Sequence, residues 1–244
     1  MDFKNIVVIG GGVLGSQIAF QSAYSGFNVT ILTNDEKSKD DIRNRLNKLK
    51  VTYQREILNM EASKDIAKWS MGISDYDNFN RDNCIAKTNN AINSIVIKTD
   101  QAAALKNADL VIESITENLK IKISLFKQIA PLLPERTVIV TNSSTLLPSK
   151  MAKYTKRPDK FLSLHFANNI WKNNIAEVMA QSKTNKKYFE DVLVFAKNIR
   201  MVPLPIYKEK SGYLLNSILV PFLFSALDLL VNGISDVESI DKAW

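Results

Sequence analysis

The sequence predicts an α/β protein with a doubly wound, mostly parallel sheet, followed by the start of an all-helical C-terminal domain. Short apolar segments alternate with helical patterns through about residue 205, as expected for strands joined by crossover helices. A glycine-rich turn separates the first strand from the first helix, and a long apolar segment begins after Lys210. We therefore expect a Rossmann-like domain over residues 1–206. Residues 207–244 would be the first part of a helical domain.

The first strand, its turn and the first helix form a dinucleotide-binding signature. An apolar, β-branched segment leads into Gly-Gly-Gly-Val-Leu-Gly, and helical spacing follows. Gly10 permits the tight turn, Gly12 lets the backbone approach a pyrophosphate, and Gly15 lets the helix pack against the strand. The phosphates would meet free N–H groups at the helix start, at Val13 and Leu14. These five residues predict a cofactor site.

The end of the second strand, residues 28–32, bears on the choice between NAD and NADP. An Asp or Glu at this place binds the ribose 2′-hydroxyl of NAD. Thr33 and Asn34 occupy it here, and Asp35 comes later. Either Asp35 reaches the ribose, or a nearby base accepts the 2′-phosphate of NADP. The basic residues that follow are Lys37, Lys39 and Arg43. The sequence favours NAD and leaves NADP open, with Thr33 and Asn34 as candidate contacts.

The remaining elements of the first domain follow from periodicity and breakers. Residues 61–98 are polar and rich in Asn and Asp, and their role is left open. Pro203 cannot donate to a ladder, so the last strand is expected at a sheet edge. We expect strands at residues 108–113, 137–140, 161–165 and 201–204, and helices at residues 40–60, 119–133 and 188–197.

The apolar segment at residues 214–231 is interrupted by polar residues and by Pro221. A membrane span needs about 20 predominantly apolar residues, so we expect a buried helix, kinked at Pro221, and no membrane partner. A capping-box pattern at residues 235–238 starts another helix, which runs into Trp244. These helices must pack on the first domain, on another subunit or on residues beyond this sequence.

Composition excludes several function classes. The 244 residues include one cysteine, Cys84, and one histidine, so neither a disulfide framework nor a transition-metal site is expected. The net charge of +7 arises from basic residues scattered among acidic ones. We interpret it as a solvated surface that also favours phosphorylated ligands, rather than a nucleic-acid site. The N-terminus leads directly into the first strand without a signal peptide, which favours a cytoplasmic protein.

The single histidine, His165, lies at the end of an apolar strand and is the candidate for proton transfer. Ser144 also comes shortly after an apolar strand, and Glu177 follows twelve residues after the histidine. The alternative for His165 is an ordinary core or surface histidine. Ser144 could instead cap a helix, and Glu177 could be a strand-edge carboxylate.

These segments in this order resemble the 3-hydroxyacyl-CoA dehydrogenase family, and within it the diketoreductase branch. The resemblance covers about residues 3–60 and 107–244. It is carried by Gly-Val-Leu-Gly-Ser-Gln-Ile-Ala-Phe-Gln from Gly12, by Thr-Asn-Ser-Ser-Thr-Leu-Leu-Pro-Ser from Thr141, and by His-Phe-Ala-Asn from His165. It implies an NAD-binding domain, a helical domain that makes a homodimer, and a small acyl or acyl-CoA substrate in fatty acid metabolism.

The resemblance also implies roles for single residues. His165 would be the general acid/base, Glu177 would orient its imidazole, and Ser144 would bind the substrate oxygen. Asn216 would complete the catalytic group from the helical domain. On the cofactor side, the residues lining the ribose and nicotinamide would be Glu117, Lys122 and Asn142.

Some features depart from the family pattern. Thr33 stands in place of the acidic ribose ligand, and Asn169 stands where many members have proline. Residues 61–98 form a longer segment than usual, at the place where the family has a helical hairpin that contacts CoA. The family also continues past Trp244, so the chain resembles a truncated member. The implied activity is NAD(H)-dependent interconversion of 3-hydroxyacyl and 3-oxo groups, on a CoA ester or a β-diketo acid. The alternative is an inactive nucleotide-binding remnant without its dimer domain.

Overall fold

A computed structural model describes residues 2–63 and 65–244. Its sheet has eight strands in the order β3-β2-β1-β4-β5-β6-β7-β8. All neighbours pair in parallel except β6 and β7, which pair antiparallel. The strands are β1 (Asn5–Ile9), β2 (Asn28–Leu32), β3 (Val96–Lys98), β4 (Leu110–Glu113), β5 (Val138–Thr141), β6 (Phe161–Phe166), β7 (Ile175–Met179) and β8 (Val202–Ile206). This confirms the expected doubly wound, mostly parallel sheet.

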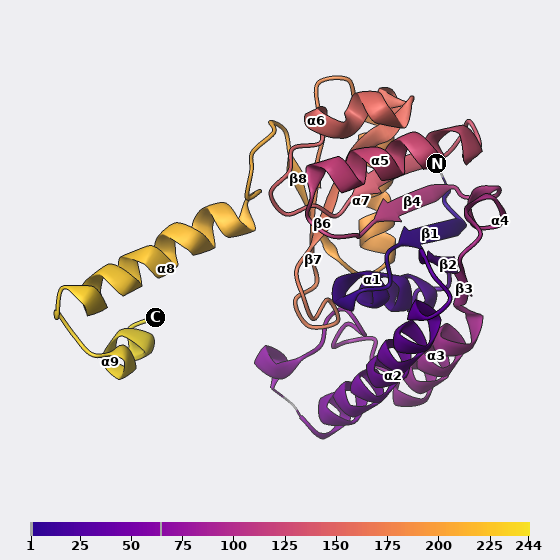
Figure 1. The fold of residues 1–244 in the computed structure, drawn as a ribbon. Helices are drawn as coiled ribbons and strands as arrows, with labels where there is room; N and C mark the ends of the chain where they lie inside the picture. Colours follow the sequence, from indigo (N-terminus) through magenta and orange to yellow (C-terminus); the bar gives the residue numbers. More distant parts are fainter. Residues whose placement is uncertain (1, 64) are drawn as a thin grey trace.

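Helices cover both faces of the sheet (Figure 1). The α-helices are α1 (Val13–Tyr24), α2 (Ser38–Ala62), α3 (Arg81–Ser94), α4 (Gln101–Leu105), α5 (Leu119–Ile129), α6 (Ser149–Ala152), α7 (Lys186–Asn198), α8 (Leu215–Val231) and α9 (Val237–Lys242). Short 3-10 helices are η1 (Ile66–Lys68), η2 (Ala130–Leu132), η3 (Lys153–Thr155) and η4 (Pro158–Lys160).

Two cores lie on opposite faces, and the alternation of side chains along β1 shows why. Ile6 and Val8 join a core with α1, α2, α3 and α7, whereas Val7 and Ile9 join a core with α4, α5 and α6. Successive side chains of a strand point to opposite faces, so a strand covered on both sides reads as continuously apolar. The parallel strands therefore end at a common edge, where the polar turns gather.

Residues 61–98, left open by the sequence, contain α3 and the short strand β3. Helix α3 buries only Cys84, Thr88 and Ala91, a narrow stripe at helical spacing. One cysteine, one threonine and one alanine gave too weak an apolar signal for a helix to be assigned. β3 has three residues and no buried one, so it carried no strand signal either.

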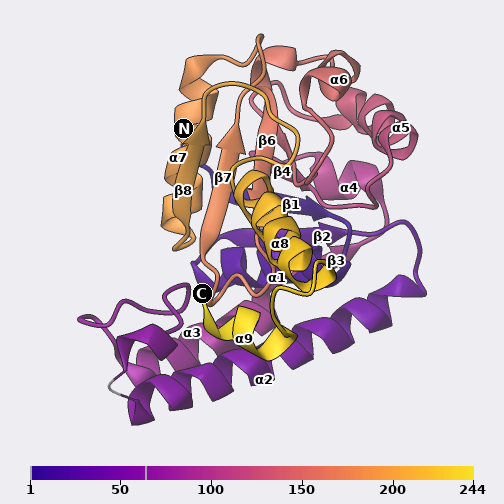
Figure 2. The same cartoon turned by 90° about the vertical axis from the view of Figure 1, so that its left-hand side faces the viewer.

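The C-terminal helix differs from expectation. We expected residues 214–231 to be a buried helix, but α8 has no buried residue. Figures 1 and 2 show why: α8 projects away from the sheet, with α9 folded back beside its far end. Within residues 2–63 and 65–244, no helix has both the length and the apolar character needed to cross a bilayer.

Candidate active site and cofactor cleft

His165 and Glu177 lie directly opposite each other on the antiparallel pair β6 and β7. The His165 Nδ1 atom is 2.8 Å from Glu177 Oε2. Glu177 is 1% exposed and His165 is 8% exposed, so their contact is shielded from water. Among the described residues, the Nε2 atom of His165 has no hydrogen bond. The antiparallel turn thus fixes one ring nitrogen and leaves the other for a substrate.

The second oxygen of Glu177 holds the start of α8. Its Oε1 atom accepts hydrogen bonds from the backbone N–H groups of Leu214 and Leu215, both at 2.8 Å. Burial alone would raise the pKa of Glu177. The hydrogen bonds from His165 and from the two amides outweigh burial and lower the pKa below its ordinary value. Glu177 therefore stays ionised and joins the histidine to the C-terminal helix.

Tyr213 packs against His165, a contact that the sequence analysis did not anticipate. The two rings lie 4.9 Å apart between centroids and are tilted by 36°. Tyr213 is 1% exposed, and it follows Gly212 in a turn where both residues have positive φ angles of 53° and 82°. Gly212 adopts such a φ without strain. This turn brings Tyr213 against His165 just before α8 begins.

Glu117 shapes the turn that carries Ser144. Its Oε1 atom accepts hydrogen bonds from the Ser143 hydroxyl (2.5 Å), the Ser144 N–H (3.2 Å), and the Thr145 N–H and hydroxyl (2.9 and 2.8 Å). Burial raises the pKa of Glu117, but these bonds and the charge of Lys122 lower it to about 2. The Ser144 hydroxyl has no hydrogen bond among the described residues. Glu117 holds the serine turn through its backbone and leaves this hydroxyl available.

Glu117 contacts a buried polar cluster formed by Glu113, Lys122 and Thr141. Lys122 is 1% exposed, and its Nζ atom lies 2.5 Å from Glu113 Oε1 and 3.5 Å from Glu117 Oε2. The other oxygen of Glu113 accepts a hydrogen bond from Thr141 at 2.6 Å. A buried charge needs a partner and hydrogen bonds. Lys122 is therefore held in the interior by both glutamates.

Asn142 ties the ends of β5 and β6 together. Its Oδ1 atom accepts a hydrogen bond from Phe166 N–H at 3.1 Å, and its amide donates to Ser114 Oγ at 3.4 Å. The structure thus brings Asn142, Ser144 and His165 to one edge of the sheet. Asn216 lies in the first turn of α8, next to the residues that bind Glu177. Its side chain has no hydrogen bond among the described residues.

The glycine turn fits a dinucleotide. A Cβ atom at Gly10 would lie 2.5 Å from the Ser114 carbonyl oxygen, and one at Gly15 would lie 2.0 Å from the Gly10 carbonyl oxygen. Side chains are therefore excluded where the backbone packs closely. A Cβ atom at Gly12 would meet open space, and no side chain caps the start of α1 at Val13. The free N–H groups and the positive end of the helix dipole form an anion site.

A cleft of about 710 Å³ opens above this turn. Thr33 and Asn34 line it at the end of β2, and Arg45 lines it from α2. Ile121, Ser124 and Gln128 line it from α5. The cleft lies at the point where the strand order reverses between β1 and β4, which is where open α/β sheets bind ligands.

The turn between β6 and β7 explains the departure at Asn169. This residue has φ 58°, and its N–H donates to Gln17 Oε1 at 2.8 Å. Proline has φ near −65° and no N–H, so it cannot take this conformation. Asn169 therefore ties the turn to α1 in a way that proline cannot.

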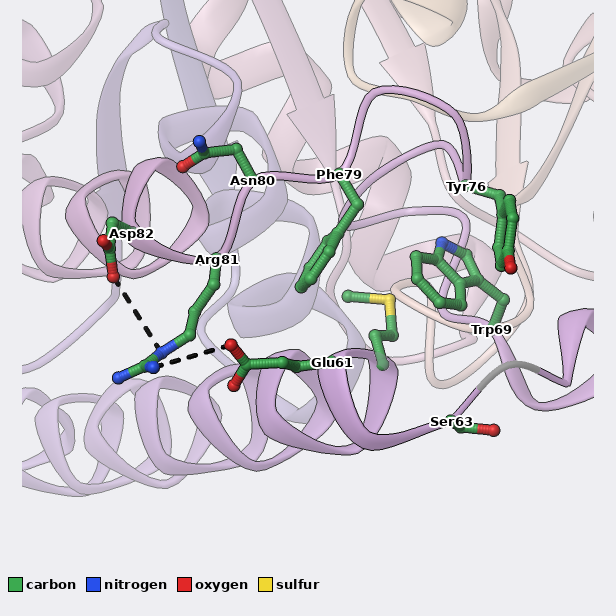
Figure 3. A pocket seen from close by; sticks show the side chains of 9 residues that line it. Glu61, Ser63, Trp69, Tyr76, Phe79, Asn80, Arg81 and Asp82 are labelled. Atoms are coloured by element: carbon green, nitrogen blue, oxygen red, sulfur yellow. Dashed lines mark ion pairs between the residues drawn. The ribbon is translucent and has the colours of Figure 1, made fainter.

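A second cavity of about 610 Å³ lies where α2 ends and α3 begins. Figure 3 shows the Trp69 indole between Tyr76 and Phe79, and Arg81 reaching toward Glu61 and Asp82. None of the predicted site residues lines this cavity. It is separate from the site at the ends of the parallel strands.

Comparison with known proteins identifies the family. Residues 5–210 match the family model described as 3-hydroxyacyl-CoA dehydrogenase, NAD binding domain. Human mitochondrial hydroxyacyl-coenzyme A dehydrogenase is 32% identical, over 98% of this chain and 70% of that protein. The 3-hydroxybutyryl-CoA dehydrogenase of Clostridioides difficile is 30% identical, over 98% of this chain and 75% of that protein.

A solved structure of a diketoreductase, described as acting on dicarbonyl compounds, is 42% identical and superposes with a TM-score of 0.85. It covers 100% of this chain, which spans 78% of that structure. The sheet order, the glycine cradle and these matches agree. The chain therefore belongs to the 3-hydroxyacyl-CoA dehydrogenase family, in its diketoreductase branch, and is an NAD-binding oxidoreductase acting on CH–OH groups.

Proposed function

We propose that this chain interconverts a 3-hydroxyacyl group and its 3-oxo form, with His165 as general acid/base and Glu177 as its partner. The observation that carries the proposal is the buried contact of 2.8 Å between His165 Nδ1 and Glu177 Oε2. It lies at the same sheet edge as the Ser144 turn. An ionised carboxylate on one ring nitrogen favours the charged imidazole and orients the other nitrogen toward a substrate.

In the oxidising direction, the Nε2 atom of His165 removes the proton of the substrate hydroxyl. Glu177 remains ionised and stabilises the imidazolium that forms. In the reducing direction, the imidazolium returns this proton to the substrate oxygen. The Ser144 hydroxyl and the Asn216 amide donate hydrogen bonds to that oxygen as its charge changes. NAD, when bound, supplies the hydride acceptor or, in its reduced form, the hydride donor.

Four of the proposed cofactor contacts line the cleft, namely Gly10, Gly12, Thr33 and Asn34. Gly10, Gly12, Gly15 and the N–H groups of Val13 and Leu14 would hold the pyrophosphate. The residues proposed at the ribose and nicotinamide are Thr33, Asn34, Glu117, Lys122 and Asn142. Lys122 is buried between Glu113 and Glu117, so its contribution acts through Glu117.

The substrate class is the finer part of the proposal. The relatives from human and C. difficile are named for CoA substrates, whereas the 42%-identical diketoreductase is described with dicarbonyl compounds. The higher identity favours a small β-dicarbonyl acyl compound, and CoA contacts from residues 61–98 stay a prediction. The cytoplasmic location and the role in fatty acid metabolism also stay predictions.

The test mixes the purified chain with NADH and either acetoacetyl-CoA or a free β-diketo ester, and follows the absorbance of reduced nicotinamide. We expect consumption of NADH, faster with the free diketo compound. Faster turnover of acetoacetyl-CoA would reverse the substrate preference. NADH binding without turnover of either compound would favour the inactive nucleotide-binding remnant.

We also propose the division into two domains after residue 206, with a homodimer formed through the helical part. β8 ends at Ile206, and α8 has no buried residue. An exposed apolar helix of this kind favours association.

A further inference from the structure

We propose that Arg45 binds a phosphate of the adenosine half of the nicotinamide cofactor. The proposal rests on the placement of that cofactor in the cleft above the glycine turn. No role for Arg45 follows from the strand-turn-helix signature, because this arginine lies on α2, well beyond the end of β2.

The packing of α2 brings Arg45 to the glycine turn. Ile42, one turn earlier, lies so close to Gly11 that a Cβ atom there would be 2.3 Å from Ile42 Cδ1. Arg45 follows on the same face of the helix, and its Nη1 atom donates to the Gly11 carbonyl oxygen at 3.3 Å. This long bond uses one of the five guanidinium N–H groups. Arg45 is also one of the residues that line the cleft.

Two other basic residues near the start of α2 form ion pairs, whereas Arg45 does not. Lys39 is paired with Glu36 at 2.8 Å, and Arg43 is paired with Asp40 at 3.0 Å. Arg45 is half-buried and has no ion pair among the described residues. Asp41 also lines the cleft but does not pair with Arg45. A half-buried guanidinium with free donors at a phosphate-binding turn is suited to binding a phosphate.

Two cofactor phosphates could satisfy this guanidinium. The pyrophosphate lies at Gly12 in this class of turn, and the 2′-phosphate of NADP would lie near the end of β2. Thr33 places no carboxylate there. Asp35 is hydrogen-bonded to the Ser38 N–H and hydroxyl at 2.7 and 2.9 Å. The shared chemistry is a phosphate group, and the affinities for NADH and NADPH distinguish its position.

The experiment measures dissociation constants for NADH and NADPH by fluorescence titration of the full chain. Arg45→Met removes the charge but keeps the length, and Arg45→Lys keeps the charge. Arg55→Met is the matched control, because Arg55 lies on the same helix, is 68% exposed and does not line the cleft. Thermal melting of each variant checks the fold.

We expect Arg45→Met to weaken binding by about 10- to 100-fold, the range for hydrogen bonds to a charged group. Arg45→Lys should recover part of the loss, and Arg55→Met should bind as the wild type does. An equal loss for both cofactors assigns the pyrophosphate, and a larger loss for NADPH assigns the 2′-phosphate. Constants within about twofold of wild type for both cofactors would overturn the inference. If the wild type binds neither cofactor, the proposed function itself fails.

Discussion

Glu177 serves two parts of the protein through its two oxygens. One oxygen contacts the His165 imidazole, and the other accepts the first amides of α8 at Leu214 and Leu215. The orientation of the proton-transfer group is therefore linked to the position of the C-terminal helix. Because Glu177 is 1% exposed, water cannot replace either contact at low cost.

Glu177→Gln tests this double role. Glutamine keeps the shape but removes the charge that stabilises the imidazolium and the start of α8. We expect turnover to fall on the order of 10²-fold or more, with NADH affinity unchanged. Steady-state rates and NADH titration on the same samples provide the measurement. Unchanged turnover would show that the contact has a structural role only.

Glu117 contributes stability that depends on pH. Its pKa is lowered from 4.5 to about 2 in the folded chain, so the native state binds the proton more weakly than the unfolded state. A depressed carboxylate pKa stabilises the fold above the unfolded value, and this contribution is lost as pH falls through the folded value. We expect Glu117→Gln to be less stable than wild type above about pH 4.5, with the difference shrinking toward pH 2. Urea denaturation across this range measures it, and a difference independent of pH would contradict the account.

Sequence reasoning located residues whose chemistry depends on position along a strand. His165 and Ser144 come at or after the ends of apolar strands, and parallel strands bring such positions to one edge. Glu177 instead lies within β7 and faces His165 across the antiparallel pair. Tyr213 and Arg45 could not be found in this way. Their contacts depend on a turn with positive φ and on the angle at which α2 packs, and neither has a sequence signal.

At the scale of elements, the β6–β7 turn depends on one backbone conformation. Asn169 has φ 58° and donates its N–H to Gln17. We expect Asn169→Pro to lower the free energy of unfolding by about 3 kcal/mol, from the forbidden φ and the lost hydrogen bond. Asn169→Gly should be close to wild type. Thermal melting compares the variants, and equal stability of the proline variant would show that the turn takes another conformation.

Elements with strong periodicity were predictable, and short polar ones were not. The expected strand at residues 137–140 is observed as β5, and the expected edge strand at residues 201–204 as β8. By contrast, α3 buries only a three-residue stripe and β3 pairs only with β2. Such elements depend on tertiary packing that a single sequence does not display.

For the whole molecule, we propose that the chain associates through the exposed apolar face of α8. Phe224 and Leu227 are 65% and 50% exposed. Burying such side chains contributes roughly 1.5–3 kcal/mol each, so we expect the chain to self-associate through this helix. Phe224→Ser with Leu227→Ser should shift sedimentation toward the monomer and leave NADH affinity unchanged. A wild-type chain that stays monomeric at every concentration would contradict the proposed dimer.

The doubly wound sheet was predictable because the patterns that indicate strands, turns and helices repeat along the chain. The packing of α8 was not predictable. Strand, turn and helix recur through about residue 205 and admit few topologies. The apolar pattern at residues 214–231 indicates that the helix packs against another surface, but it does not identify that surface. We expected a buried helix, covered by the first domain, by another subunit or by residues beyond this sequence, and the structure shows no buried residue in α8.

The proposed reaction depends on proton transfer by His165, the single histidine of the chain, through its Nε2 atom. The most direct measurement is the rate of NADH oxidation by a β-diketo ester in wild type and His165→Gln, with NADH affinity measured in parallel. We predict a loss of turnover of about 10²–10⁴-fold with unchanged NADH affinity, as for a positioned acid/base. Wild-type turnover in the variant would show that the proton moves by another route and would contradict the account.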